Sequence, residues 1–339
     1  MYKYSILLFI GFITLVLMGA CSEPEQKQAG QIGQLTVGLT PFIGEAALFV
    51  ADEKGFFEDY GLDVTLRVNN AGSESVRQLL AGEIDIAHVA ETPALFTIMD
   101  RDYFTGEKQG EIRILANMIH ANRIQKVIAR RDAGIESPQD IRGKRVGLAG
   151  GTQSEFHLDS FLLEYNIDIE EIDTVHLGVK QQIEEITAGT IDVIVTWEPN
   201  AAHSFYLLQN NAVELSTRLT YSTLWLVTTL NHFADDNPKI LTAYLRGLRK
   251  AQKYILDNPQ WTIELLSEKT GTSHEVIDDV ISQIDYELSL TERMLKLLNE
   301  QQRWMLSKGL DYGKDQSLTD LIDFRFMDEV YPEGITLIR

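Results

Sequence analysis

The sequence predicts an α/β protein built from two similar lobes, each with a parallel sheet that helices cover. The chain has 339 residues, which is long enough for about two domains. Short apolar segments alternate with amphipathic segments of helical periodicity along most of the body. In addition, one strand-and-turn pattern occurs once in each half of the body, which favours two related units.

The first unit has the order strand, helix, strand, helix, strand, which is typical of a parallel sheet. Apolar or alternating segments predict strands at residues 35–39, 63–68 and 84–89. A helix over residues 44–54 would end at Gly55, since glycine adopts the left-handed conformation at low cost. We expect Ser73 to be the N-cap of the next helix and Gly82 to end it.

The pattern that occurs twice aligns residues 81–91 with residues 188–198. At one constant offset, five residues of the first segment (Ala81, Gly82, Ile84, Asp85 and Glu91) correspond to Ala188, Gly189, Ile191, Asp192 and Glu198. Residues 37–39 and 146–148 both read Val-Gly-Leu at nearly the same offset. Any two strand–helix units can share part of this pattern. However, the offset between the two segments stays constant through the strand and the turn to the following glutamate, which favours two similar lobes.

The second unit and the end of the chain complete the arrangement. Strands are predicted at residues 145–149, 191–196 and 223–228, and only helices after that, including residues 240–255 and 294–306. We expect the chain to pass between lobes near residues 120–123 and 221–223. Lobe one would then contain residues 34–121 and 224–339, and lobe two residues 122–223.

The N-terminus has the features of an export signal. Lys3 precedes an apolar run over residues 6–17, which is shorter than the ~20 residues that span a bilayer. The run ends in Met18-Gly19-Ala20-Cys21, which resembles a bacterial lipobox. We therefore predict a signal peptide over residues 1–20, lipidation of Cys21, and a polar tether to residue 33. The alternative is an ordinary cleaved signal. Either way the protein is expected outside the cytoplasm, and with the lipid it is anchored to a membrane.

Composition excludes several functions. The chain has 50 acidic and 30 basic residues, so its net charge of −20 argues against a nucleic-acid partner. A single cysteine excludes a disulfide framework and a multi-thiolate metal site. The seven histidines have no ligand spacing, so no metal is expected. Neither a serine-nucleophile elbow nor a phosphate-binding loop occurs, and no cofactor is expected.

A ligand site is expected where loops follow the carboxyl ends of the strands, between the two lobes. The candidate binding residues lie in those loops and are Thr40, Pro41, Phe42, Gly72, Ser73, Glu91, Thr92, Gly151, Thr152, Gln153, Ser154, Trp197 and Glu198. Residues 150–154 open a helix, whose first N–H groups attract anions. Trp197 offers a flat wall, and a carboxylate at Glu198 or Glu91 can accept from an ammonium or a ring N–H. The alternatives are a plain capping turn at residues 150–154, helix-start acids at both glutamates, and a core aromatic at Phe42.

Several of these motifs together resemble one protein family. Residues 51–57 (ADEKGFF), 60–64 (YGLDV), 71–73 (AGS) and 81–86 (AGEIDI) are similar to the solute-binding proteins of nitrate/sulfonate/taurine-type ABC importers. Residues 137–147 (SPQDIRGKRVG) resemble the entry to that family's second lobe, and Gly151-Thr152 and Trp197-Glu198-Pro199 extend the match. The resemblance covers roughly residues 35–260.

The resemblance implies a type II periplasmic-binding-protein fold: two α/β lobes joined by two crossovers, with a ligand cleft between them. It also implies a partner permease with a cytoplasmic ATPase, a monomer, and no catalysis by this chain. Residues 152–154 would hold an anionic group of the ligand, with Trp197 and Glu198 at its other end. Two departures matter: Glu155-Phe156 stands where the sulfonate binders often have His-Tyr, and Glu198 replaces the usual aspartate.

We therefore expect an extracytoplasmic binding lipoprotein that delivers a small organic solute to a permease. Helix-start amides on one wall and two acids on the other favour an amine-bearing acid such as taurine, or a pyrimidine stacked on Trp197. A ligand sensor that serves a membrane receptor is one alternative. An enzyme related to the pyrimidine synthases is another, although their cysteine-rich motif is missing here.

Overall fold

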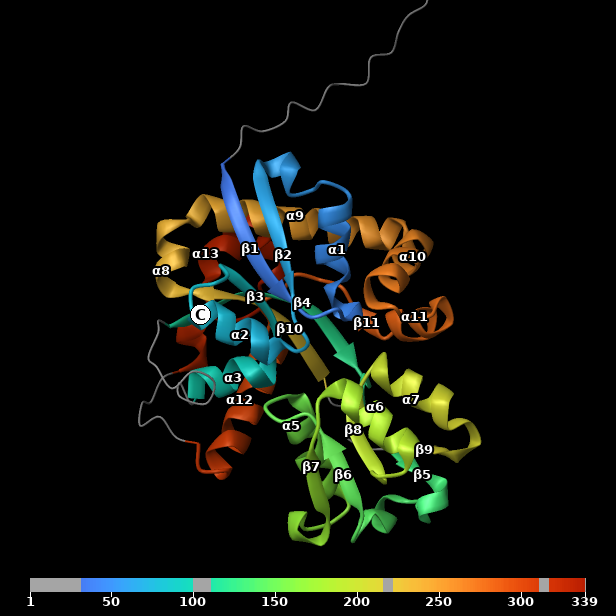
Figure 1. The fold of residues 1–339 in the computed structure, drawn as a ribbon. Coiled ribbons are helices and arrows are strands. Elements are labelled where there is room, and N and C mark those ends of the chain that lie inside the picture. Colours follow the sequence, from blue (N-terminus) through green and yellow to red (C-terminus); the bar gives the residue numbers. More distant parts are fainter. Residues whose placement is uncertain (1–31, 100–110, 216–221, 311–316, 339) are drawn as a thin grey trace, which may run out of the picture.

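The computed structural model describes residues 32–99, 111–215, 222–310 and 317–338. The predicted signal peptide, Cys21 and most of the tether lie outside the described residues. The chain forms two α/β lobes, each a mixed sheet with helices on its faces (Figure 1). No helix within the described ranges has the length and apolar character that crossing a bilayer requires.

The first lobe contains a six-stranded sheet in the order β11-β4-β10-β3-β1-β2. Its strands are β1 (Gly33–Leu39), β2 (Leu62–Val68), β3 (Ile86–Ala90), β4 (Ile112–Asn122), β10 (Ser222–Leu230) and β11 (Ile284–Asp285). Strand β1 pairs in parallel with β2 and β3, and β10 runs antiparallel between β3 and β4. The helices of this lobe are α1 (Ala46–Glu53), α2 (Gly72–Leu80), α3 (Glu91–Met99), α8 (Asn231–Asp236), α9 (Pro238–Asp257), α10 (Pro259–Thr270), α11 (His274–Ile281), α12 (Glu292–Ser307) and α13 (Phe324–Val330).

The second lobe contains a five-stranded sheet in the order β7-β6-β8-β5-β9. Its strands are β5 (Gln125–Arg130), β6 (Arg145–Leu148), β7 (Asp173–His176), β8 (Val193–Trp197) and β9 (Ala212–Glu214), and its helices are α5 (Gln153–Glu164), α6 (Val179–Ala188) and α7 (Asn200–Leu208). Small apolar clusters lie on both faces of this sheet, whereas the first lobe has one large core.

The chain crosses between the sheets twice. The first crossover lies between β4 and β5, where Arg123 takes a positive φ of 66°. The second lies between β9 and β10, and residues 216–221 of it are outside the described ranges. The lobe boundaries drawn from the sequence, 34–121 with 224–339 and 122–223, stay a prediction.

The internal repeat is visible in the hydrogen bonds. The carboxylate of Asp85 accepts from the Thr36 N–H at 2.8 Å, and that of Asp192 accepts from the Arg145 N–H at 3.0 Å. In both lobes the backbone N–H of the same aspartate also donates to the carbonyl of the strand residue, at 2.9 Å and 3.0 Å. The two aspartates therefore bind a residue of β1 (Thr36) and of β6 (Arg145) in the same way.

Three local predictions are wrong. Ser73 is not the N-cap of α2: Ala71 takes that position, two residues earlier, and the helix begins at Gly72. Gly72 packs closely against Val89, since a Cβ at this position would lie 3.0 Å from the Val89 side chain. The Glu74 carboxylate accepts from the Asn70 N–H, just before the helix. The third strand spans Ile86–Ala90 rather than residues 84–89. Finally, the C-terminal part also contains β11, a two-residue strand that pairs with β4.

Candidate ligand pocket between the lobes

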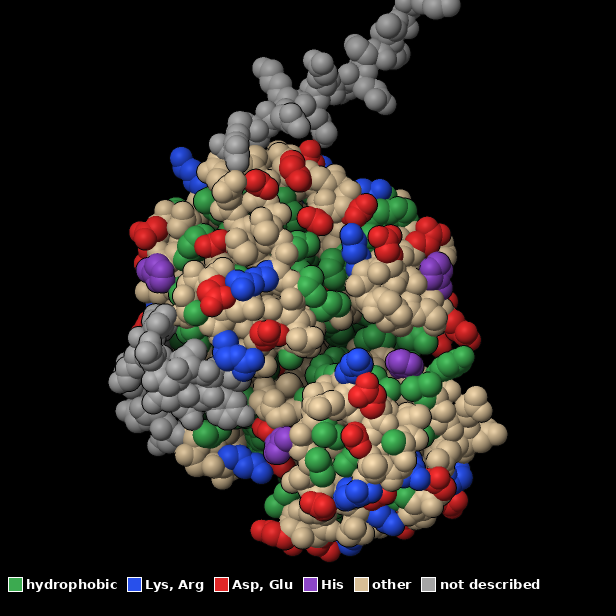
Figure 2. Space-filling model, viewed as in Figure 1, with side chains coloured by type: hydrophobic (Ala, Val, Ile, Leu, Met, Phe, Trp, Pro, Cys, Tyr) green, Lys and Arg blue, Asp and Glu red, His purple; other side chains and the backbone are tan. Residues whose placement is uncertain are grey.

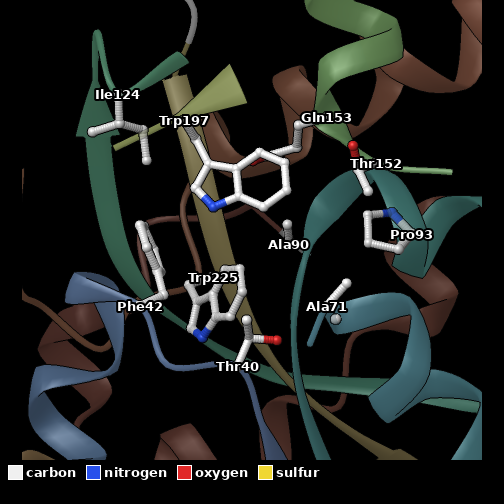
Figure 3. A pocket seen from close by; sticks show the side chains of 11 residues that line it. Thr40, Phe42, Ala71, Ala90, Pro93, Ile124, Thr152, Gln153, Trp197 and Trp225 are labelled. Atoms are coloured by element: carbon white, nitrogen blue, oxygen red, sulfur yellow. The ribbon is translucent and has the colours of Figure 1, made fainter. Parts of the chain in front are cut away.

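A pocket lies between the two lobes, at the ends of strands from both sheets (Figure 3). It contains about 460 Å³ of space free of protein atoms, part of which is open to solvent. Eleven residues line it, namely Thr40, Phe42, Ala71, Gly72, Ala90, Pro93, Ile124, Thr152, Gln153, Trp197 and Trp225. In the space-filling view, hydrophobic side chains gather along the boundary between the lobes, and charged ones are scattered over the outer surface (Figure 2).

Two helices begin at this pocket, one from each lobe. Ala71 and Gly72 are the N-cap and first residue of α2, and Thr152 and Gln153 hold the same positions in α5. The first N–H groups of a helix have no partner within the helix, and the helix dipole adds partial positive charge there. Thr152 orders the α5 end, because its hydroxyl donates to the Ala149 carbonyl at 2.7 Å and accepts from the Ser154 N–H at 3.2 Å. The arrangement therefore favours a ligand with acceptor or anionic groups.

The rest of the wall is aromatic. Trp197 ends β8 in the second lobe, and Trp225 lies in β10 of the first lobe. Phe42 packs on Trp225 with ring centroids 5.0 Å apart. Figure 3 shows the two indoles one above the other, with Phe42 on one side and Thr152 and Pro93 on the other. Such flat surfaces suit a planar ring or an aliphatic body.

Two buried polar atoms of the lining have no partner among the described residues. They are the indole N–H of Trp225, which is 7% exposed, and the hydroxyl of Thr40, which is 8% exposed. Leaving such groups unpaired costs roughly 1–3 kcal/mol each, so a ligand that supplies acceptors gains that amount. None of the eleven lining residues is acidic, basic or a histidine.

Gln153 links the pocket to a buried hydrogen-bond cluster around Glu91. Its side-chain amide donates to both carboxylate oxygens of Glu91 at 2.7 Å, across the lobe boundary. The same carboxylate accepts from the side chain of Gln301 at 2.8 Å and from the backbone N–H of Leu224 at 3.0 Å. Glu91 is fully buried, and its carboxylate is used by protein donors from both lobes.

Glu198, at the equivalent position of the repeat, has a different environment. Its carboxylate accepts from the Ala202 N–H at 3.0 Å, so it caps its own helix α7. Burial raises the pKa of Glu198, and the Ala202 hydrogen bond opposes that shift. Neither Glu91 nor Glu198 lines the pocket, so the acidic wall expected from the sequence is not part of the lining.

The structure brings six of the predicted residues into the pocket lining: Thr40, Phe42, Gly72, Thr152, Gln153 and Trp197. The other seven, Pro41, Ser73, Glu91, Thr92, Gly151, Ser154 and Glu198, lie next to lining residues but do not line it. Thr92, for example, donates to Gln301 at 2.8 Å. The roles of all thirteen in binding stay predictions.

Five lining residues were not predicted: Ala71, Ala90, Pro93, Ile124 and Trp225. Ala71 and Pro93 adjoin predicted residues, so their position in the same loops was a usable signal. Trp225 lies in the middle of a strand, where alternation along the strand does not reveal that a second lobe faces it. Within the described ranges, no group of three or more His, Cys, Asp or Glu side chains could hold a metal ion.

Several solved structures have the same fold. The alkanesulfonate-binding protein SsuA from Xanthomonas axonopodis pv. citri, bound to MOPS, superposes with a TM-score of 0.71, covers 87% of this chain and 99% of its own, and is 15% identical. The periplasmic nitrate-binding protein NrtA from Synechocystis also has a TM-score of 0.71, with 88% of each chain covered and 17% identity. The predicted periplasmic-binding-protein fold is thereby confirmed. The desulfurization enzyme DszB has the same fold (TM-score 0.67, 17% identity, 89% of this chain and 99% of its own), so fold alone does not separate binding from catalysis.

A family model described as NMT1/THI5 like matches residues 44–262, and the chain belongs to this family. One relative is the formylaminopyrimidine-binding protein of Halalkalibacterium halodurans, 21% identical over 81% of this chain and 81% of its own. Another is the taurine-binding periplasmic protein of Escherichia coli, 20% identical over 63% of this chain and 64% of its own. These relatives confirm the family resemblance read from the sequence.

Proposed function

We propose that this chain is the extracytoplasmic solute-binding protein of an ABC importer, which captures a small organic solute between its lobes and delivers it to a permease. The observation that carries this proposal is a pocket shared by the two lobes, each of which contributes a helix N-terminus and an aromatic side chain to its wall. Mostly apolar walls with a few directed polar groups, placed between two domains, are typical of small-molecule sites.

The lining favours a pyrimidine-like ring or an alkanesulfonate over taurine. A flat or aliphatic body fits between Trp197 and Trp225, and acceptor atoms can bind the Trp225 N–H, the Thr40 hydroxyl and the helix amides. The ammonium of taurine would have no carboxylate among the lining residues to pair with. Two relatives are named for the solutes that they bind, formylaminopyrimidine and taurine, and both of these are small organic molecules.

Capture would follow from closure of the two lobes. A ligand that contacts Thr152 and Trp197 on one side and Thr40 and Trp225 on the other stabilises the closed arrangement more than the open one. Capture needs no bond to form or break, and we propose no catalytic role for this chain.

The test is calorimetry and thermal shift with four compounds: formylaminopyrimidine, MOPS, taurine and nitrate. We expect formylaminopyrimidine or MOPS to bind with a dissociation constant in the micromolar range or tighter, and taurine and nitrate to bind at least tenfold more weakly. Trp225→Phe keeps the ring but loses the N–H, and it should weaken binding roughly five- to tenfold. Trp261→Phe, in the first lobe and outside the pocket lining, is the control. No binding of any compound, or equal binding by the Trp225 variant, would contradict the proposed site.

We further propose that the mature protein begins at a lipidated Cys21, acts as a monomer and meets its permease at the membrane surface. This rests on the apolar run and the lipobox-like residues 18–21. Mass spectrometry of the membrane fraction should find residues 1–20 removed and acyl chains on Cys21. Cys21→Ser should release the protein from the membrane; membrane retention of that variant would rule the lipid anchor out.

A further inference from the structure

Side chains at the C-terminal end of helix α12 in the first lobe contact helix α5 of the second lobe, outside the pocket lining. The indole N–H of Trp304 donates to the Asp159 carboxylate at 2.8 Å, and Lys308 forms an ion pair with the same carboxylate. The Trp304 ring also lies edge-on to Phe156, with centroids 5.2 Å apart. These contacts join a C-terminal element to the helix whose first residues line the pocket.

The residues that make these contacts lie on one face of each helix. Gln301, Trp304 and Lys308 are at positions i, i+3 and i+7 of α12 and its C-terminal end, so they share one face. Phe156 and Asp159 are three residues apart on α5 and share a face as well. Gln301 on the same α12 face binds Glu91, which in turn binds Gln153 at the start of α5.

Trp304 packs against the core of the first lobe and also contacts the second lobe. Its ring lies edge-on to Phe96 of α3 in the first lobe, with centroids 5.9 Å apart, and to Phe156 of α5 in the second. Edge-to-face pairs of this kind are favourable beyond the area they bury. Opening of the lobes would separate Trp304 from Phe156 and from Asp159 together.

We propose that Trp304 and Asp159 are positioning residues for ligand binding: they form a latch that holds α5, and with it the pocket wall at Thr152 and Gln153, against the first lobe, an arrangement called closed below. The inference rests on the proposed function, since it concerns closure around a solute. The latch contacts no lining residue other than through α5, so it sets how often the closed arrangement occurs and leaves the ligand contacts unchanged.

The hydrogen bond to Asp159 carries more of the latch than the ion pair. A hydrogen bond to a charged acceptor is stronger than one between neutral groups, and the Asp159 side chain is 21% exposed. The Lys308 side chain is 45% exposed, so its attraction to Asp159 is screened by solvent. We therefore expect loss of the Trp304 N–H to shift the equilibrium more than loss of the lysine charge.

The experiment measures the distance between the lobes in the ligand-free full chain. With Cys21→Ser, two spin labels go on Lys239→Cys in α9 and Leu163→Cys at the end of α5; both positions are exposed. Double electron–electron resonance should give one dominant short distance. Trp304→Phe and Asp159→Asn should each raise the long-distance population roughly three- to tenfold. Asp159→Glu, which retains a carboxylate, should restore the short distance in part.

The control is Lys296→Gln on the same helix, where Lys296 is 78% exposed and pairs only with Glu300 of its own helix among the described residues. It should leave the distances unchanged. Unchanged distances in both Trp304→Phe and Asp159→Asn would overturn the latch, and so would a loss of thermal stability without a change in distance, because that is a purely structural role. Failure of all four solutes to bind would defeat the proposed function but would leave these distances interpretable.

If MOPS or formylaminopyrimidine binds, the dissociation constant of that probe gives a second readout. It should rise in Trp304→Phe by the factor by which the closed fraction falls. Equal affinity despite a larger open population would also contradict the proposal.

Discussion

At the scale of single residues, two glutamates at equivalent places in the repeat have different partners. Glu91 follows β3 and Glu198 follows β8, and each lies at the start of the next helix or just before it. Glu91 accepts from Gln153 of the other lobe, from Gln301 of α12 and from the backbone N–H of Leu224 in β10. Glu198 binds the first turn of its own helix. The same residue type therefore joins the lobes in one case and caps a helix in the other.

This difference predicts unequal costs for one substitution made at both places. Glu91→Gln puts an amide N–H₂ against the donors of Gln153, Gln301 and Leu224, and should cost roughly 3 kcal/mol of the free energy of unfolding. Glu198→Gln keeps an oxygen for the Ala202 N–H and removes a buried charge, so it should change stability by less than about 1 kcal/mol. Urea unfolding at pH 7 measures both, and equal values would argue against the Glu91 cluster as described.

The buried His157 predicts loss of stability in acid. Burial, assisted by Lys126, lowers the pKa of His157 from its usual 6.5 to about 4. Between these values the unfolded chain takes up a proton that the folded chain does not, so stability is lost as pH falls from 6.5 toward 4. The loss from this group reaches roughly 3 kcal/mol. His157→Gln should flatten the pH dependence of urea unfolding over this range, and exposed His203→Gln should not. An unchanged slope in the His157 variant would count against this assignment.

At the scale of elements, the two lobes repeat one strand arrangement. In each sheet one strand (β1 or β6) pairs in parallel with both of its neighbours. One of those neighbours (β3 or β8) pairs on its other side with an antiparallel strand (β10 or β5). The antiparallel strand comes directly after a crossover in both lobes. The sequence repeat predicts parallel strands, but the antiparallel strands lie outside the repeated segments.

Asp85 and Asp192 predict matched local effects in the two lobes. Replacing either by Ala removes the acceptor for the Thr36 N–H of β1 or the Arg145 N–H of β6 and should cost about 1 kcal/mol. Amide hydrogen exchange should speed up at Thr36 in Asp85→Ala and at Arg145 in Asp192→Ala, each in its own lobe. Exposed Asp173→Ala, on the neighbouring β7, is the control. Faster exchange spread evenly over both lobes would contradict a local strand-fixing role.

At the scale of the whole molecule, the position of the pocket follows from the crossovers. Because β10 returns to the middle of the first sheet, Trp225 meets Phe42 and lies opposite Trp197 of the second lobe. The pocket wall is therefore made of side chains from both lobes. A ligand between them therefore buries surface that neither lobe can bury by itself.

This geometry predicts that a bound solute stabilises the whole chain and changes its fluorescence. At a concentration one hundred times the dissociation constant, a ligand that binds only the folded form adds about 2.7 kcal/mol. Two of the four tryptophans line the pocket, so binding should shift the emission spectrum. Trp197→Phe should remove much of that shift, whereas Trp261→Phe should leave it. A shift that persists in the Trp197 variant and vanishes in the Trp261 variant would point to a site elsewhere.

The sequence by itself determined the α/β class, the strands and helices of the repeated pattern, the two-lobe repeat and the loops at which a ligand site would form, but not strands β4, β5, β7, β9 and β11. These features depend on periodicity and turn residues within short stretches, which a local pattern records. Only the tertiary structure decided which loop residues face the pocket, since that depends on contacts between distant segments. The carboxylate of Glu91 meets Leu224 and Gln301, 133 and 210 residues away. No local pattern encodes such partners, so the acid expected to face a ligand instead joins the two lobes.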